Sequence, residues 1–159
     1  MKKNGEFIAK LIAHVNRKKW WHVPPRDRSA YYKRGKFLAS TFREAEFWGR
    51  PLDEPQKVRI VSPLIGDEQF IEKELFGRQL SAEGMRLKDR WSLDARIKRA
   101  ALAGGYDSVV LMTPKAFVEF RKTGKIPRSV ELNLVHASDT KSGSNKKRNV
   151  AKSKNAGLK

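Results

Sequence analysis

Glu131 is an acidic residue within an apolar, alternating stretch of the chain, RSVELNLVHAS at 128–138. The apolar side chains at positions 130, 132 and 134 alternate with Glu131, Asn133 and Val135, which is the period-two pattern of a β-strand. A carboxylate on such a strand is either exposed to solvent or placed to stabilise a positively charged transition state. The chain has 35 Lys and Arg residues against 17 Asp and Glu, so an acid at this position needs one of these explanations.

His22 is the second candidate, and it stands in the short aromatic stretch KWWHV at 19–23. Taken alone, it is best explained as a half-buried histidine at the end of a strand. A Ser-His-Asp catalytic group is poorly supported, because no serine stands in a nucleophile-elbow motif. The histidines of the chain are His14, His22 and His136, and their spacing matches no zinc-ligand pattern.

The stretch GKFLASTFREAEFWG at 35–49 is the third candidate, because it brings several aromatic side chains together. A strand that packs on an ordinary helix explains it most simply, with Phe37, Phe42, Phe47 and Trp48 in the core. Each of the three features therefore has a purely structural explanation when it is taken alone.

The elements that must position these residues are short. The pattern predicts helices at 5–16, 41–50, 66–81 and 113–125, strands at 19–23, 36–41, 57–65 and 129–136, and a loop at 24–36. The stretch 93–112 is predicted as a helix that stops at Gly104 and Gly105 and is followed by a strand. Strands and helices mix without a repeating strand–helix rhythm, which favours an α+β fold.

Length and charge indicate one basic domain with a tail. The 159 residues suit a single domain at 1–138, which begins with the helix at 1–18. The formal charge of +18 predicts attraction to a polyanion, whether nucleic acid, an anionic membrane or an acidic partner. Residues 139–159 carry seven basic side chains and one acidic side chain, which leaves +12 on the domain. This tail is predicted to be disordered when free.

Several classes of protein are disfavoured. The chain has no cysteine, which excludes a disulfide framework and a cysteine metal site. No apolar run approaches the roughly 18 residues that cross a bilayer. The N-terminal stretch is interrupted by polar and basic residues and has no cleavage site, so an amphipathic helix is expected there and not a signal peptide. A cytoplasmic location is expected, with delivery into a host cell as a further option.

Taken in order, the three candidates resemble a known family. A histidine at the end of an early strand, a G-x-aromatic-x-(A/S) strand that runs into a helix, and a glutamate on the last strand resemble the ADP-ribosyltransferase family. The closest resemblance is to its diphtheria-toxin-like branch, which has a His–Tyr–Glu arrangement. The stretches KVRIVSPLIGDE, ALAGGYDSVVLM and SVELNLV are also similar to family segments, so the resemblance spans about residues 19–136. It implies a split, mixed β-sheet with flanking helices, NAD⁺ as a substrate, and no metal.

The resemblance also implies roles for single residues. His22 matches the histidine that binds the adenine-side ribose, and Val23 stands where the family usually has glycine and would offer backbone groups to the carboxamide. Phe37 matches the tyrosine that stacks on nicotinamide, and it keeps the ring that stacking requires. Phe47 or Trp48 would supply another wall. Ser40 and Thr41 would contact the amide or the ribose.

Glu131 matches the catalytic glutamate, which stabilises the oxocarbenium-like ribose formed when the N-glycosidic bond of NAD⁺ breaks. The resemblance predicts that His22, Phe37 and Glu131 surround one cleft. The Arg–Ser–Glu branch, with Arg26 or Arg28 as its arginine, ranks second. That branch often has a further Glu or Gln where this chain has Ser129.

Two functions follow from these observations. The first is a mono-ADP-ribosyltransferase that acts on a protein or nucleic-acid acceptor, of the kind found among phage proteins and toxin-like bacterial effectors. The alternative is a non-enzymatic nucleic-acid-binding protein on a degenerate form of the same fold. In that case phosphates would be contacted by the basic side chains Arg26, Arg28, Lys33, Arg34, Lys146, Lys147 and Arg148. Bases would meet aromatic side chains interleaved with the first four, namely Trp20, Trp21, Tyr31 and Tyr32.

Overall fold

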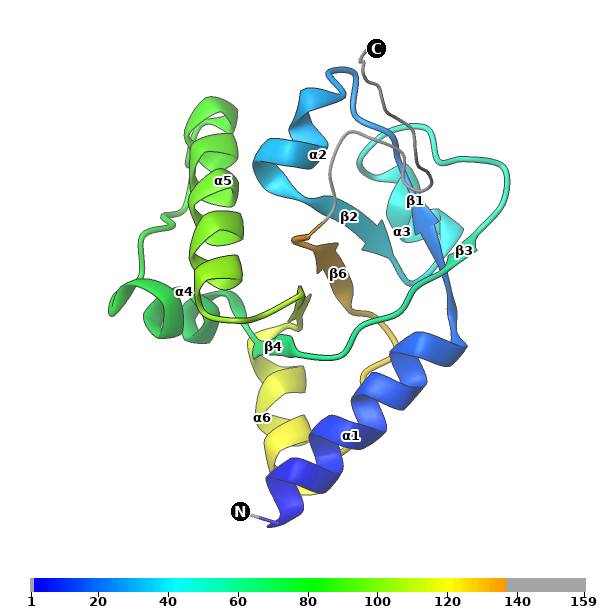
Figure 1. The fold of residues 1–159 in the computed structure, drawn as a ribbon, viewed down its shortest axis with the longest axis vertical. Helices are drawn as coiled ribbons and strands as arrows, with labels where there is room; N and C mark the ends of the chain where they lie inside the picture. The colour runs from blue at the N-terminus through cyan, green and yellow to red at the C-terminus, as the bar shows by residue number, and fades with distance from the viewer. Residues whose placement is uncertain (1, 137–159) are drawn as a thin grey trace, which may run out of the picture.

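A six-stranded mixed sheet organises the chain in the computed structural model, which describes residues 2–136 (Figure 1). The strand order is β3-β1-β2-β6-β5-β4, and every neighbouring pair is antiparallel except β4 and β5. The last strand along the chain, β6, therefore lies in the centre. The strands are β1 (Lys19–His22), β2 (Lys36–Ala39), β3 (Gln56–Lys57), β4 (Pro63–Gly66), β5 (Ser108–Leu111) and β6 (Glu131–Leu134).

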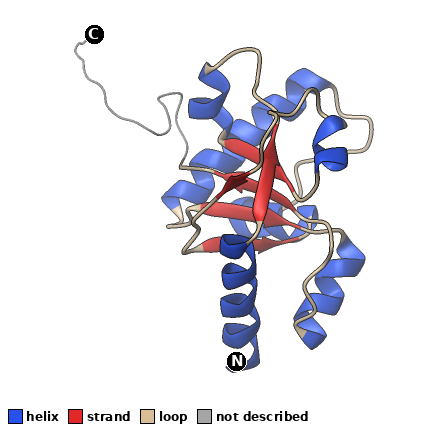
Figure 2. Cartoon of the chain, turned by 90° about the vertical axis from the view of Figure 1, so that its right-hand side faces the viewer, coloured by secondary structure: helices blue, strands red, loops and turns tan. Residues whose placement is uncertain are grey.

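Helices cover both faces of this sheet (Figure 2). One face packs on α1 and α6 through a core that includes Leu11, Phe117 and the strand residues Leu38 and Leu132. The other face packs on α4 and α5 through a second core that includes Ile97. The expectation of an α+β fold is confirmed. The helices are α1 (Lys2–Arg17), α2 (Ser29–Arg34), α3 (Phe42–Glu46), α4 (Glu68–Phe76), α5 (Leu87–Ala103) and α6 (Pro114–Thr123).

Short polar side chains start three of these helices. The side chains of Thr41, Asp67 and Thr113 each accept a hydrogen bond from the backbone N–H three residues later, which satisfies a donor that the first turn leaves unpaired. Gly77 and Gly124 end α4 and α6 in the left-handed conformation. The predicted starts of α3 and α6 are confirmed, although α3 ends at Glu46 and not at the predicted residue 50.

The stretch 24–36, predicted as a loop, contains α2. The side-chain carboxylate of Asp27 accepts a hydrogen bond from the backbone N–H of Ser29 at 3.0 Å. The backbone carbonyl of Asp27 accepts one from the N–H of Ala30 at 2.9 Å. Ala30 is buried, and α2 packs on α5. Tertiary contacts therefore stabilise a helix that its proline- and arginine-rich surroundings did not indicate.

The single strand predicted at 57–65 is also corrected, because β3 ends at Lys57 and β4 begins at Pro63. Between them, side chains take the place of a neighbouring strand. The Asn16 amide donates to the carbonyl of Ile60 and accepts its N–H, while the Asp107 carboxylate accepts the N–H groups of Val61 and Ser62. These bonds satisfy a β-patterned backbone outside the sheet.

The predicted tail at 139–159 lies outside the described residues. Among residues 2–136, none of the helices is long and apolar enough to cross a membrane.

Candidate functional site

Glu131 lies on the face of the sheet that α4 and α5 cover. Its register partners are Ala39 on β2 and Leu111 on β5, and Phe37 is the partner of Asn133. Residues directly opposite each other in neighbouring strands point to the same face. Phe37 and Glu131 therefore share one face, and the leucines on either side of Asn133 pack in the opposite core, as the alternation of β6 predicts.

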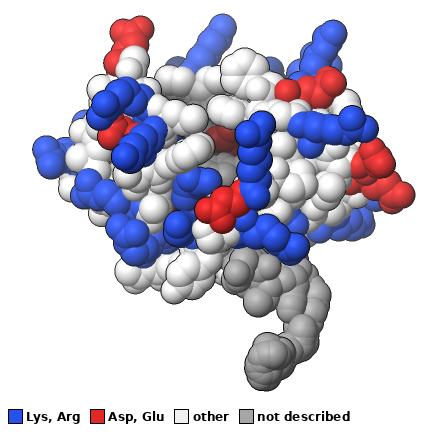
Figure 3. All heavy atoms as spheres, turned by 90° about the horizontal axis from the view of Figure 1, so that it is seen from above, with Lys and Arg blue, Asp and Glu red and all other residues white. Residues whose placement is uncertain are grey.

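Helices border this part of the sheet on two sides. The ring of Trp21, the register partner of Ala39, meets the ring of Phe42 edge-on at 5.1 Å, which places α3 over β1 and β2. Ile97 of α5 packs with Val109 of β5 on the other side. Figure 3 shows an acidic side chain recessed between uncharged atoms, with Lys and Arg side chains around it.

A small pocket opens between this face and the helices α4 and α5. Its cavity volume is about 40 Å³, which is room for about two or three water-sized groups and not for a nucleotide. Phe37 and Glu131 line it from the sheet. Four of the chain's 17 acidic residues meet here around one basic side chain, so the local charge opposes the net charge of the protein. These residues are Glu68, Glu72, Asp94, Glu131 and Arg90.

Burial controls the protonation of the acids in the pocket. It raises the pKa of Glu131, and the nearby charge of Asp94 raises it further, whereas Arg90 lowers it. Burial likewise raises the pKa of Asp94 to about 6, against the opposing effect of Arg90. Both carboxyl groups therefore favour the neutral form more than an exposed acid does. They stay protonated at a pH where surface carboxyl groups are already ionised.

Arg90 and Glu72 fix the far wall of the pocket. The Arg90 guanidinium donates to Glu68 at 2.8 Å and lies 3.5 Å from the Asp94 carboxylate. Oε1 of Glu72 accepts the backbone N–H groups of Leu80 and Ser81 at 2.6 and 2.7 Å. Oε2 of Glu72 is buried and has no hydrogen-bond partner among the described residues. The acids therefore connect α4 to α5 and to the segment that follows α4.

The prediction of one cleft shared by His22, Phe37 and Glu131 needs correction. His22 is the register partner of Leu38, so it lies on the opposite face from Glu131. Both of its ring nitrogens are engaged within the protein, Nδ1 with the Phe37 carbonyl and Nε2 with the Tyr31 hydroxyl, each at 2.8 Å. The pocket gathers Phe37 and Glu131 without His22.

Three other predicted NAD⁺-binding residues lie away from the pocket lining. The buried hydroxyl of Ser40 donates to the carbonyl of Val130 and accepts its N–H, so it fixes the residue before Glu131 and does not line the pocket. Val23 is half-buried and packs beside Gly49. Phe47 is 81% exposed and contacts only the ring of Trp48 among the aromatic pairs of the described residues.

The predicted basic residues separate into two groups. Arg26, Arg28 and Lys33 are exposed. Arg34 is half-buried, and its guanidinium lies over the Trp91 ring. Lys146, Lys147 and Arg148 lie outside the described residues. Of the four aromatic residues predicted to interleave with them, Trp20 is buried, Trp21 and Tyr31 are half-buried, and Tyr32 is exposed.

Reasoning from the sequence missed the acids of α4 and α5, Arg90 and Trp91. One signal was available, because Glu68 and Glu72, like Arg90 and Asp94, stand four residues apart and so share a helix face. Asp94 and Lys98 are also adjacent to the buried Leu93 and Ile97, which placed charge at the edge of an apolar stripe. Which strand these faces approach depends on tertiary packing.

No family model, curated protein or solved structure matches this chain. Among residues 2–136, no group of three or more His, Asp or Glu side chains is arranged to hold a metal ion.

Proposed function

We propose that this protein is a NAD⁺-dependent mono-ADP-ribosyltransferase in which Glu131 is the catalytic carboxylate. The observation that carries the proposal is the position of Glu131, at a pocket in the middle of the sheet and on the same face as the Phe37 ring. The resemblance of residues 19–136 to that family supports the assignment of the reaction. The acceptor is a macromolecule, either protein or nucleic acid.

The chemistry explains why a carboxylate is required. The bond between C1′ of the ribose and the nicotinamide nitrogen breaks, and its electron pair leaves with nicotinamide. C1′ then carries positive charge until a nucleophile of the acceptor attacks it and loses a proton. A carboxylate that accepts a hydrogen bond from the ribose 2′-hydroxyl stabilises this charge, whereas an amide keeps the hydrogen bond and loses the charge.

The size of the pocket limits what enters it. A cavity of about 40 Å³ admits the edge of the ribose that carries the 2′-hydroxyl, and the rest of NAD⁺ would lie outside its mouth. In this proposal Phe37 gives one wall for ring stacking, and Ser40 is a positioning residue that holds the backbone just before Glu131. The side chain of His22 has no part in it, because its ring is bonded on the other face.

The acid cluster adds a dependence on pH. Glu131 must be ionised to stabilise the cation, and its raised pKa means that activity falls with decreasing pH earlier than an exposed glutamate would cause. Asp94 contributes because its own charge disfavours ionisation of Glu131.

The test uses labelled NAD⁺ and measures two readouts, nicotinamide release and transfer of label, with and without nucleic acid and host lysate. We expect Glu131→Gln to lower nicotinamide release by about 10²–10³-fold. Glu74→Gln is the matched control, since Glu74 is an exposed acid on α4, and it should react like the wild type.

Two results would oppose the proposal in different ways. Equal turnover by wild type and Glu131→Gln would remove Glu131 from the mechanism. A folded wild-type protein that neither releases nicotinamide nor transfers label, yet binds nucleic acid, would instead support the non-enzymatic alternative.

A further inference from the structure

Two exposed aromatic side chains stand over the junction of α2 and α5. Tyr32 of α2 is 69% exposed and Trp91 of α5 is 46% exposed. Each ring has a cation beside it from the opposite helix, because the Arg34 guanidinium lies 4.7 Å from the Trp91 ring and the Lys98 ammonium lies 5.0 Å from the Tyr32 ring. Large aromatic surfaces left open to solvent among cations indicate a binding surface.

Lys98 holds this surface together. Its side chain is buried, and its ammonium group donates to the backbone carbonyls of Tyr31 and Tyr32 near the end of α2. Trp91 and Lys98 are seven residues apart, which is about 10 Å along a helix axis at 1.5 Å per residue. The two aromatic contacts are therefore fixed at separate places along one helix–helix junction.

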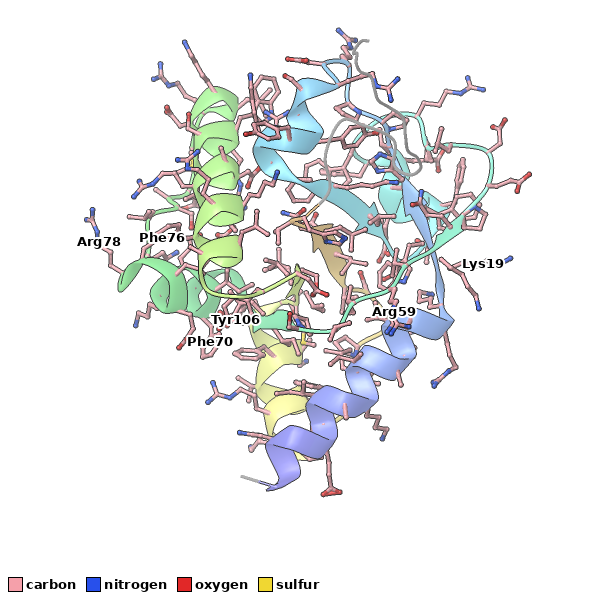
Figure 4. The ribbon with its side chains drawn as sticks, in the orientation of Figure 1. Lys19, Arg59, Phe70, Phe76, Arg78 and Tyr106 are labelled. Atoms are coloured by element: carbon pink, nitrogen blue, oxygen red, sulfur yellow. The ribbon has the colours of Figure 1, made fainter. Side chains whose placement is uncertain are left out.

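The charge around the two rings is mainly positive. The sequence of α2 holds Lys33 and Arg34 and no acid, and the exposed Arg28 immediately precedes it. Acids on or beside these two helices are engaged: Asp27 accepts the backbone N–H of Ser29, Asp89 pairs with Arg86, and Asp94 lies beside Arg90. Basic side chains point outward elsewhere too, such as Lys19 and Arg78 at opposite edges of Figure 4, so charge alone would not single out this surface.

We propose that single-stranded nucleic acid binds across α2 and α5, with bases stacking on Tyr32 and Trp91 and phosphates contacting Arg28, Lys33 and Arg34. Aromatic rings among basic side chains are the arrangement that binds unpaired bases without sequence preference, because every base has a flat face. In a duplex these faces are covered by neighbouring bases, so the rings favour single strands. The binding does not depend on NAD⁺ chemistry, and Glu131→Gln should leave it unchanged.

The experiment measures fluorescence anisotropy of a labelled oligothymidylate with the full-length chain over a series of salt concentrations. Removing one stacking ring, in Tyr32→Ala or Trp91→Ala, should weaken binding about 5- to 150-fold with little change in the salt slope. Trp91→Phe should restore most of the affinity. Trp48→Ala is the matched control, because Trp48 is 65% exposed near α3, and its affinity should equal that of the wild type.

Charge variants separate stacking from phosphate contact. Lys33→Gln and Arg28→Gln should each reduce the salt slope by about 0.7, the value for one phosphate contact on a single strand. Because Tyr32 and Trp91 are exposed, their alanine variants should unfold at temperatures close to that of the wild type, which thermal unfolding checks.

Three results would overturn the proposal. They are unchanged oligothymidylate affinity in both alanine variants, equal affinity for a duplex of the same length, and equal binding of inorganic polyphosphate with the same response to the variants. The last result would assign the surface to polyanions that lack bases.

Discussion

Protonation of His22 should destabilise the fold in mild acid, and the contacts of its ring explain why. The Phe37 carbonyl can only accept a hydrogen bond, so Nδ1 of His22 carries the proton and Nε2 accepts from the Tyr31 hydroxyl. A second proton on Nε2 would remove that acceptor. Burial lowers the pKa of His22 from 6.5 to about 4, with a smaller contribution from the charge of Lys36.

The sign and size follow from this pKa. Because the folded-state pKa lies below the unfolded value, the unfolded chain takes up the proton first, and stability is lost as the pH falls from 6.5 towards 4. The difference between 6.5 and about 4 corresponds to about 3 kcal/mol of unfolding free energy. A neutral side chain at position 22 would remove this dependence.

Urea unfolding of wild type and His22→Gln at a series of pH values provides the assay. Glutamine stays neutral, and the other titrating groups are shared by both proteins and cancel in the comparison. We expect the unfolding free energy of the wild type to fall by about 3 kcal/mol more than that of the variant between neutral pH and about pH 4. The reasoning is refuted by parallel pH profiles, or by an NMR titration of the His22 ring with a pKa near 6.5.

Two further predictions concern Asp94 and Gly35. Asp94→Asn should raise the free energy of unfolding by up to about 3 kcal/mol at pH 7 and by little near pH 4. The reason is that the raised pKa of about 6 makes the charged carboxylate costly above that pH. Urea unfolding that gives the same gain at both pH values would contradict this prediction. Gly35→Ala should lower the free energy of unfolding by more than about 1 kcal/mol, because Gly35 has a φ of 89° and an added Cβ would overlap the Asn133 side chain. Gly77→Ala is the control for Gly35→Ala in denaturant unfolding, since Gly77 has a φ of 78° and open space around it. An equal loss of unfolding free energy in both variants would exclude overlap with Asn133 as the cause.

Local patterns predicted much of the secondary structure. The alternation of β6 placed Glu131 on the face opposite Leu132, and α3 and α6 begin where the helices at 41–50 and 113–125 were predicted to begin. These features depend on neighbours within a few residues along the chain, so the sequence contains them directly. The errors at 24–36 and 57–65 arose where distant side chains decided the outcome, such as Asn16 bonding to Ile60.

The arrangement of the site was less predictable, because it depends on the register between strands. Each strand shows which of its own residues share a face, but a shift of one residue between strands exchanges the faces. The pairing of His22 with Leu38, and of Ala39 with Glu131, separated two residues that the resemblance placed together. The acids on α4 and α5, and the meeting of Trp91 with Arg34, likewise required the packing of helices.

The central position of β6 has a consequence for how the protein is made. The strands β2 and β5 each lack one of their two neighbouring strands until residues 131–134 have been synthesised. In a shorter chain both strands therefore expose an unpaired edge. Pairing of β6 with β2 also closes a long segment of chain, which slows folding. The sheet must therefore be completed late, after the ribosome has released nearly the whole domain, and nascent chains truncated before β6 should be prone to aggregate.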